Sequence, residues 1–185
     1  MTDWEAALTT ALQVLEGVIV SDVWVREMAF YGREDAGCFV DPTLAFVQGN
    51  VLELRTSGGE TFHFSCHQDD DSWALWVGTV PSSRRLAPDI GEGWFRVRPL
   101  PEFPRGRVDK AQVAASLSNI QEIRIVIDGR ETILRAGEVY ENMDGTLTVC
   151  DHDESVLIFV DGEAYARQIF NAPVYRPQVA APSGS

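Results

Sequence analysis

From Gly17 onward the chain is divided into short apolar segments, and this division limits the possible folds more than any other feature. The segments are rich in β-branched and aromatic residues, and Gly, Asn, Asp or Pro residues separate them. This pattern is typical of antiparallel strands joined by tight turns. The sequence therefore predicts strands at residues 18–30, 43–48, 51–56, 61–66, 73–78, 120–127, 131–141, 146–150 and 155–162.

A helical pattern precedes the strands. Thr2 or Asp3 can cap a helix, and apolar residues then follow at intervals of three and four as far as Leu15. Gly17 is placed to end this helix, whose apolar side we expect to pack on the core. A shorter helical segment of one or two turns is predicted at residues 163–170.

Turn signals join the predicted strands into hairpins. Residues 49–50, 57–60 and 128–129 each separate two strand-like segments, and the Asp-Gly pair at 128–129 is the strongest hairpin signal of the three. Residues 107–119 leave two alternatives open, because their alternation favours a strand whereas their Ala content suits a helix.

The chain is predicted to be a mainly β member of the α+β class, with an N-terminal helix and two antiparallel meander-like units. The helix and the first unit occupy residues 1–78, a connection with one short strand occupies 79–104, the second unit occupies 105–175, and 176–185 form a disordered tail. Both units repeat a glycine-led strand, a hairpin, an acidic turn and an apolar strand. A degenerate tandem duplication and a chance likeness between two meanders both explain this repetition. The two units are expected to pack as one globule.

Charge narrows the class of partner. The chain has 28 Asp and Glu residues against 15 Lys and Arg residues, so its formal net charge is −13. Such a charge repels phosphate groups, and we therefore expect neither nucleic acids nor anionic membranes as partners. A basic protein would be attracted. The alternative is that the charge serves only solubility.

The N-terminus is acidic and lacks the basic and apolar regions of a secretory signal. Three widely spaced Cys residues do not form a disulfide framework. The sequence therefore predicts a cytoplasmic protein. Arg greatly outnumbers Lys, which suggests a GC-rich genome.

The His, Cys and Asp residues between His63 and Asp71 raise the hypothesis of a metal site. The candidate zinc ligands are His63, Cys66, His67, Cys150 and His152. Zinc binds such ligands, but strand alternation places His63 and Cys66 on opposite faces. The acidic runs at 69–71 and 151–154 lack the spacing of an EF-hand loop. No metal site is predicted.

Catalytic motifs are also missing from the sequence. It contains no G-x-S-x-G, no P-loop and no G-x-G-x-x-G. Cys66 and His67 are adjacent, so on a strand they diverge and cannot form a catalytic pair. We therefore predict no catalytic residues and no cofactor.

The two acidic turns are the best candidates for partner binding. An exposed Trp beside carboxylates would form an apolar contact with a charged rim. Trp73 and Trp76 are three residues apart and should face opposite sides of their strand. The candidate partner-binding residues are Asp69, Asp70, Asp71, Trp73, Asp151, Asp153 and Glu154.

In architecture and composition, most of the chain resembles the immunity proteins of bacterial toxin systems. The resemblance rests on the strand–acidic turn–strand units at residues 66–77 and 150–162. It implies that the chain neutralises a basic toxin by covering its active site, with the acidic turns facing the toxin's basic channel. The alternatives are a small cytosolic hydrolase with a pocket between the β units, and a structural or assembly subunit that pairs through an edge strand.

Overall fold

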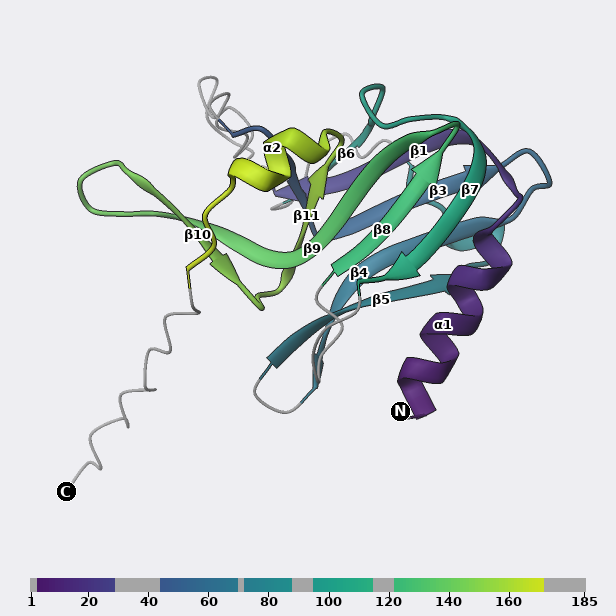
Figure 1. Cartoon of the computed structure of the whole chain (residues 1–185), viewed down its shortest axis with the longest axis horizontal. Coiled ribbons are helices and arrows are strands. Elements are labelled where there is room, and N and C mark those ends of the chain that lie inside the picture. Colours follow the sequence, from purple (N-terminus) through teal and green to yellow (C-terminus); the bar gives the residue numbers. More distant parts are fainter. Residues whose placement is uncertain (1–2, 29–43, 70–71, 88–94, 115–121, 172–185) are drawn as a thin grey trace.

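The computed structural model describes residues 3–28, 44–69, 72–87, 95–114 and 122–171 (Figure 1). Its elements are α1 (Asp3–Leu15), β1 (Ile19–Met28), β2 (Val47–Gly49), β3 (Val51–Thr56), β4 (Thr61–Asp69), β5 (Ser72–Thr79), the 3-10 turn η1 (Ser82–Arg84), β6 (Phe95–Pro99), β7 (Gly106–Val113), β8 (Glu122–Ile127), β9 (Arg130–Glu141), β10 (Leu147–Asp151), β11 (Ser155–Phe159) and α2 (Gly162–Arg167). The predicted mainly β fold with an N-terminal helix is confirmed. The tandem duplication stays a prediction, and the predicted tail at 176–185 lies outside the described residues.

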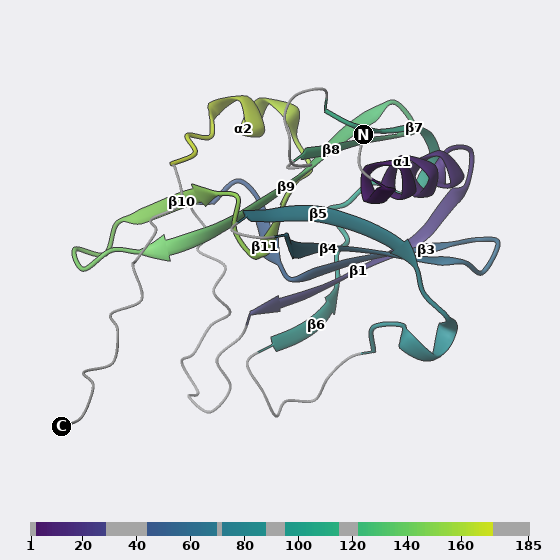
Figure 2. The same ribbon diagram turned by 90° about the horizontal axis from the view of Figure 1, so that it is seen from below.

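The strands form one antiparallel sheet in the order β2-β11-β9-β8-β7-β1-β3-β4-β5, with β10 paired to β9 and β6 paired to β1. The sheet folds over on itself into two layers (Figure 2). The first layer contains β1, β3, β4, β5 and β6, and the second contains β2 and β7 to β11. Helix α1 packs against β5 and β7, at the end where the layers diverge.

The main core lies between the two layers. Alternate residues of each strand point into it, for example Leu52 and Leu54 from β3, and Ile125 and Ile127 from β8, all with no exposed surface. This alternation is the period-two pattern from which the strands were predicted. Leu residues of α1 close the end of the same core. None of the helices in the described parts of the chain has the length and apolar character needed to cross a bilayer.

Most local predictions are confirmed. Gly17, two residues after the end of α1, has φ +83°, and Asp128 and Gly129 have φ +46° and +73° in the two-residue turn between β8 and β9. Residues 57–60 connect the β3–β4 hairpin. The ambiguous segment is a strand as far as Val113, and its remainder from residue 115 lies outside the described residues.

The predicted hairpin at residues 49–50 is wrong. β2 pairs with β11 and β3 pairs with β1, so the chain passes from the second layer to the first at Asn50 instead of reversing. A Cβ atom at Gly49 would lie 2.5 Å from Val25 Cγ2, so glycine allows the close crossing over β1. The Asn50 N–H donates to the Arg26 carbonyl at 2.9 Å and fixes the change of layer.

The second acidic turn is not a turn either. β10 and β11 run in the same direction along β9, and both Asp151 and Ser155 lie opposite Gly137. Residues 152–154 therefore form a bulge in a nearly continuous strand. A Cβ at Gly137 would lie 2.6 Å from the Cys150 carbonyl oxygen, which explains the glycine there. The first acidic stretch differs, because β4 continues to Asp69 and pairs with Ser72 at the start of β5.

Candidate functional site

One hairpin extends beyond the body of the protein (Figures 1 and 2). We call it the acidic arm, and it consists of β9 from Glu138 onward, β10, their connecting turn and the bulge at 152–154. Between residues 136 and 166 the chain has no Lys or Arg. The same stretch contains eight carboxylates: Glu138, Glu141, Asp144, Asp151, Asp153, Glu154, Asp161 and Glu163. All of them except Asp161 and Glu163 belong to the arm, which is therefore strongly negative.

The arm also presents apolar surface. Met143, at its tip, is fully exposed, and Tyr140 is 47% exposed. The Tyr140 hydroxyl donates to Asp153 Oδ2 at 2.8 Å. Burial and this carboxylate raise the pKa of Tyr140 above its usual range, so the hydroxyl stays protonated and joins the arm to the bulge.

A cavity of about 260 Å³ lies beside the base of the arm. It is formed where β2 and β11 of the second layer meet β4, β5 and β6 of the first, and we call it the seam cavity. Its lining residues are Gln48, Gly49, Asn50, Cys66, Trp73, Phe95, Glu154 and Ser155. The cavity therefore combines aromatic side chains with amide, hydroxyl, thiol and carboxylate groups.

Glu138 lies behind two of these lining residues. Its carboxyl oxygens accept hydrogen bonds from Gln48 Nε2 and from Ser155 Oγ, and the residue is only 7% exposed. Burial raises the pKa of Glu138 to about 7, the nearby Asp153 and Glu154 carboxylates add to the rise, and the hydrogen bonds from Ser155 and Gln48 oppose it. This carboxyl group therefore gains and loses its proton near neutral pH.

Two further groups complete the cavity. Asn50 Oδ1 is buried and accepts no hydrogen bond within the part of the chain that the structure describes. Cys66 Sγ donates to the Ser155 carbonyl oxygen at 3.0 Å, which ties β4 to β11. Burial and the nearby carboxylates raise the pKa of the Cys66 thiol, so it is a poor nucleophile.

The predicted partner-binding residues fall into separate places. Asp70 and Asp71 lie outside the described residues, and Asp69 is the last residue of β4. Trp73 and Glu154, which come from the two different acidic stretches, both line the seam cavity. As predicted, Trp73 and Trp76 face opposite sides, because Trp73 points inward and Trp76 is 36% exposed on the outer face.

The other two predicted residues belong to the second layer. Asp153 accepts the Tyr140 hydrogen bond on the arm. Asp151 instead accepts two hydrogen bonds from Arg135, through Nε at 2.8 Å and Nη2 at 2.5 Å. Arg135 in turn lies over the Phe170 ring, 4.4 Å from its centroid. Asp151 is thus neutralised by its own chain and is less suited to an external partner.

Sequence reasoning missed Gln48, Asn50 and Glu138. The stretch without Lys or Arg at 136–166 is a signal that could have indicated the arm. No local signal marks Gln48, which reaches Glu138 across 90 residues of sequence.

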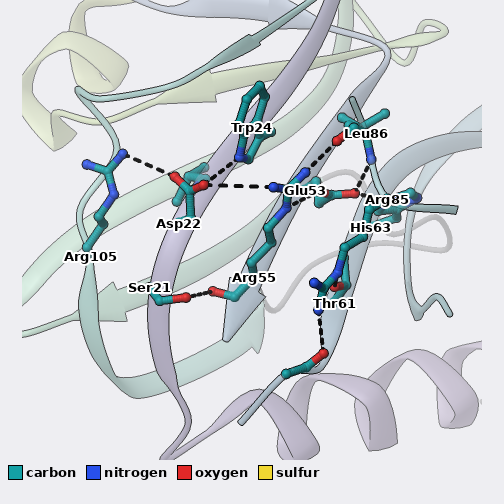
Figure 3. Close-up of polar contacts among 12 residues, drawn as sticks. Ser21, Asp22, Trp24, Glu53, Arg55, Thr61, His63, Arg85, Leu86 and Arg105 are labelled. Carbon is teal, nitrogen blue, oxygen red and sulfur yellow. Dashed lines mark hydrogen bonds and ion pairs between the residues drawn. The ribbon is translucent and has the colours of Figure 1, made fainter. Parts of the chain in front are cut away.

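A second polar cluster lies on the outer face of the first layer (Figure 3). Its centre is Glu53, which has no exposed surface. Arg55 Nε lies 2.6 Å from Glu53 Oε1, while His63 Nε2 and the Leu86 N–H lie 2.6 and 2.8 Å from Oε2. Burial raises the pKa of Glu53, but the hydrogen bonds from His63, Leu86 and Arg55 outweigh it, so the pKa lies below its usual 4.5.

This outer cluster has the properties of a structural network. The Arg55 guanidinium lies over the Trp24 ring, and the 80–87 segment covers Glu53 through Leu86. His63 faces Glu53 while Cys66 packs against the core, so the two are on opposite faces of β4 as predicted. Throughout the described ranges, no group of three or more His, Cys, Asp or Glu side chains is arranged to hold a metal ion.

Comparison of the chain with protein-family models, with curated proteins and with solved structures found no match.

Proposed function

We propose that this protein is a non-catalytic binding module whose acidic arm docks on a basic protein. The observation that carries the proposal is the projecting arm, which concentrates carboxylates around exposed Met143 and Tyr140. Complementary charge speeds the encounter with a basic partner and disfavours acidic ones. The exposed methionine and tyrosine supply the desolvated contact that holds such complexes together.

The net charge of −13 supports the same class of partner. It disfavours nucleic acids and anionic membrane surfaces, because both would add negative charge to a negative protein. In its finer form the proposal is that the partner is a toxin, and that the arm neutralises the toxin by covering a basic active-site channel.

The binding part is tested by affinity capture from the source cells. The arm variant carries Glu141→Gln and Asp144→Asn, and its matched control carries Glu60→Gln and Glu163→Gln at exposed positions outside the arm. We expect wild type and control to retain the same basic protein, and the arm variant to lose it. Equal retention by all three proteins would contradict the role of the arm.

The toxin part needs a separate experiment. Expression of the captured protein alone should arrest growth, and coexpression of this chain should restore it. Growth that is unaffected by the captured protein would remove the toxin part and leave the binding part standing.

A second candidate function is hydrolysis at the seam cavity. It is supported by the pKa of about 7 for Glu138, because a general acid is most effective when its pKa lies near the working pH. Glu138 lies behind Gln48 and Ser155, and Glu154 is the only carboxylate among the described lining residues. Hydrolysis of any ester or glycoside in a substrate panel that disappears in Glu138→Gln would favour this candidate. Activity that survives the substitution would exclude Glu138 as its acid.

A further inference from the structure

The seam cavity has the chemistry of a guanidinium site, and we propose that the basic partner inserts one arginine side chain into it. This inference rests on the proposed function, since it names the group by which the partner is held. It concerns the cavity beside the arm, whereas the proposed function concerns the charge of the arm itself.

Size favours a single side chain. The cavity measures about 260 Å³, which is below the range of roughly 300–1,000 Å³ typical of pockets for drug-sized ligands. It lies at the base of the acidic arm, because Glu154 and Ser155 belong both to the bulge region and to the cavity wall. A partner docked on the arm would therefore have the cavity within reach.

The hydrogen-bonding groups of the cavity call for a donor with a positive charge. Glu154 supplies a carboxylate, and Asn50 Oδ1 is a buried acceptor that receives no donor within the described residues. A guanidinium carries five N–H donors in one plane and accepts nothing. It can therefore serve several separate acceptors at once, and a single ammonium group does so less well.

The pattern of buried glutamates in this chain indicates the same chemistry. Four of the described glutamates are buried, namely Glu27, Glu53, Glu122 and Glu138. The first three pair with arginine: Arg98 lies 3.0 Å from Glu27, Arg55 lies 2.6 Å from Glu53, and Arg124 lies 2.7 Å from Glu122.

Glu138 differs from these three. Its hydrogen-bond partners, Gln48 and Ser155, are both neutral and both line the cavity. The charges that act on it most strongly are two further carboxylates, Asp153 and Glu154. A guanidinium in the cavity would supply the positive charge that the other buried glutamates receive from within the chain.

The aromatic wall fits a flat cation. Guanidinium groups stack on aromatic rings and are weakly hydrated, which lowers the cost of entering a small cavity. Phe95 already carries the Arg26 guanidinium 4.4 Å from its ring centroid. We therefore assign the stacking of the incoming group to Trp73, the other ring of the lining.

Binding should also be coupled to a proton. A cation near Glu138 favours its ionised form, so the affinity should rise between pH 6 and pH 8. The charged and titratable groups that act on Glu138 are Cys66 of β4, Tyr140 of β9, and Asp153 and Glu154 of the bulge. Burial raises the pKa of Cys66 and of Tyr140, so both stay protonated in this window.

The test is a titration of the full chain with N-acetyl-L-arginine amide, followed by calorimetry and by the amide and indole N–H signals in NMR. The parallel ligands are the capped lysine, the capped citrulline, which is the neutral isostere of arginine, and free L-arginine. We expect saturable binding of capped arginine with shifts at Trp73 and Glu154, and at least tenfold weaker binding of the lysine and citrulline compounds.

Two pairs of variants locate the binding. Glu154→Gln and Trp73→Leu should each weaken capped arginine about tenfold. The matched controls Glu163→Gln, which removes an exposed charge from α2, and Trp76→Leu, which alters the outer face of β5, should leave it unchanged.

The proposal is overturned if capped arginine does not bind, if lysine binds equally well, or if the two cavity variants bind like wild type. Binding of free L-arginine ten times tighter than the capped form would also overturn it, because the cavity would then serve a free amino acid. These results are separate from the capture experiment. Loss of arginine binding with retention of a basic protein by the arm removes only this inference. Arginine binding without capture of any basic protein removes the proposed function and leaves the cavity as an arginine site without that partner.

Discussion

Two buried glutamates of this protein lie in different surroundings, and their pKa values shift in opposite directions. Glu53, on the outer face of the first layer, is surrounded by donors from Arg55, His63 and the Leu86 backbone, and its pKa is lowered. Within the described ranges, Glu138 beside the seam cavity accepts hydrogen bonds from two neutral donors and has carboxylate neighbours, and its pKa is raised to about 7. Burial alone therefore does not decide the role of a carboxyl group. The charge of its partners does.

The comparison assigns the two places different roles. The Glu53 cluster holds the 80–87 segment on the sheet and already contains the cations it needs. The Glu138 site is incomplete in charge, and it opens towards a cavity through Gln48 and Ser155. A cationic ligand can therefore stabilise the Glu138 site by supplying the missing positive charge. For this reason we place the arginine pocket beside Glu138.

The largest expected effect comes from Glu53→Gln. The substitution removes the carboxylate that pairs with Arg55, and it places the amide N–H2 group of the new glutamine opposite other N–H donors. The free energy of unfolding at pH 7 should therefore fall by about 3–5 kcal/mol. Urea denaturation followed by circular dichroism measures this change. Because the pKa of Glu53 is lowered by folding, its stabilisation is present above pH 4.5 and disappears as the pH falls through the folded value. A loss below about 1 kcal/mol would mean that the network is not structural.

For Glu138 we expect the free energy of unfolding to depend on pH in the opposite direction. Folding raises its pKa from 4.5 to about 7, so the folded state binds more protons between these values. The free energy of unfolding should therefore decrease by up to about 3 kcal/mol as the pH rises through this window, and then stay level.

The substitution Glu138→Gln resembles the protonated form, so it should abolish this pH dependence and leave the protein more stable than wild type at pH 8. Denaturation curves at pH 5, 6, 7 and 8 for both proteins check this. A wild-type stability that increases through the window would refute the raised pKa.

A substitution at Gly137, which permits the bulge beside Glu138, should have an intermediate effect on the free energy of unfolding. In Gly137→Ala the new Cβ would meet the Cys150 carbonyl oxygen and Leu157 Cδ1 at 2.6 and 2.7 Å. We expect a loss of about 2 kcal/mol on unfolding, because neighbouring backbone must shift. The control is Gly58→Ala in the β3–β4 turn near Glu53, where the nearest atom, Glu60 Oε2, belongs to a flexible exposed side chain. Equal effects at the two glycines would contradict the special packing of the bulge.

The smallest effect concerns the charge around Glu138. Glu154→Gln removes one of the carboxylates that raise its pKa, so the midpoint should fall from about 7, by less than about one unit. The carboxyl carbon signal of Glu138 in a pH titration by NMR reports this shift. Glu163→Gln should leave the midpoint in place. A midpoint that rises in Glu154→Gln would show that Glu154 acts on Glu138 through structure and not through charge.

Much of the fold was predictable because its signals are local. The helix before Gly17 and the turn at 128–129 depend on the conformational preferences of a few neighbouring residues. Alternation also placed Trp73 and Trp76 on opposite faces correctly. The hairpin at 49–50 failed because a Gly-Asn pair permits a reversal without requiring one, and contacts with β1 and β11 decided the path.

The candidate site was predictable only in part. Trp73 and Glu154 were named as binding residues from aromatic and acidic character, and both line the seam cavity. Asp151 was named on the same grounds, yet it is neutralised by Arg135. Charge in a sequence shows which residues can attract a partner. It does not show which of them the fold has already paired.

The sequence by itself therefore determined most of the strands, the tight turns at 57–60 and 128–129, and the negative charge of the protein, because each depends on residue type and short-range spacing. Only the tertiary structure decided which buried carboxylates received a cation. Gln48 meets Glu138 across 90 residues and Ser155 across 107, and these contacts exist only after β2 has changed layer and the bulge has formed. The pKa of Glu138 follows from burial and neighbouring charge, and both are properties of the assembled layers.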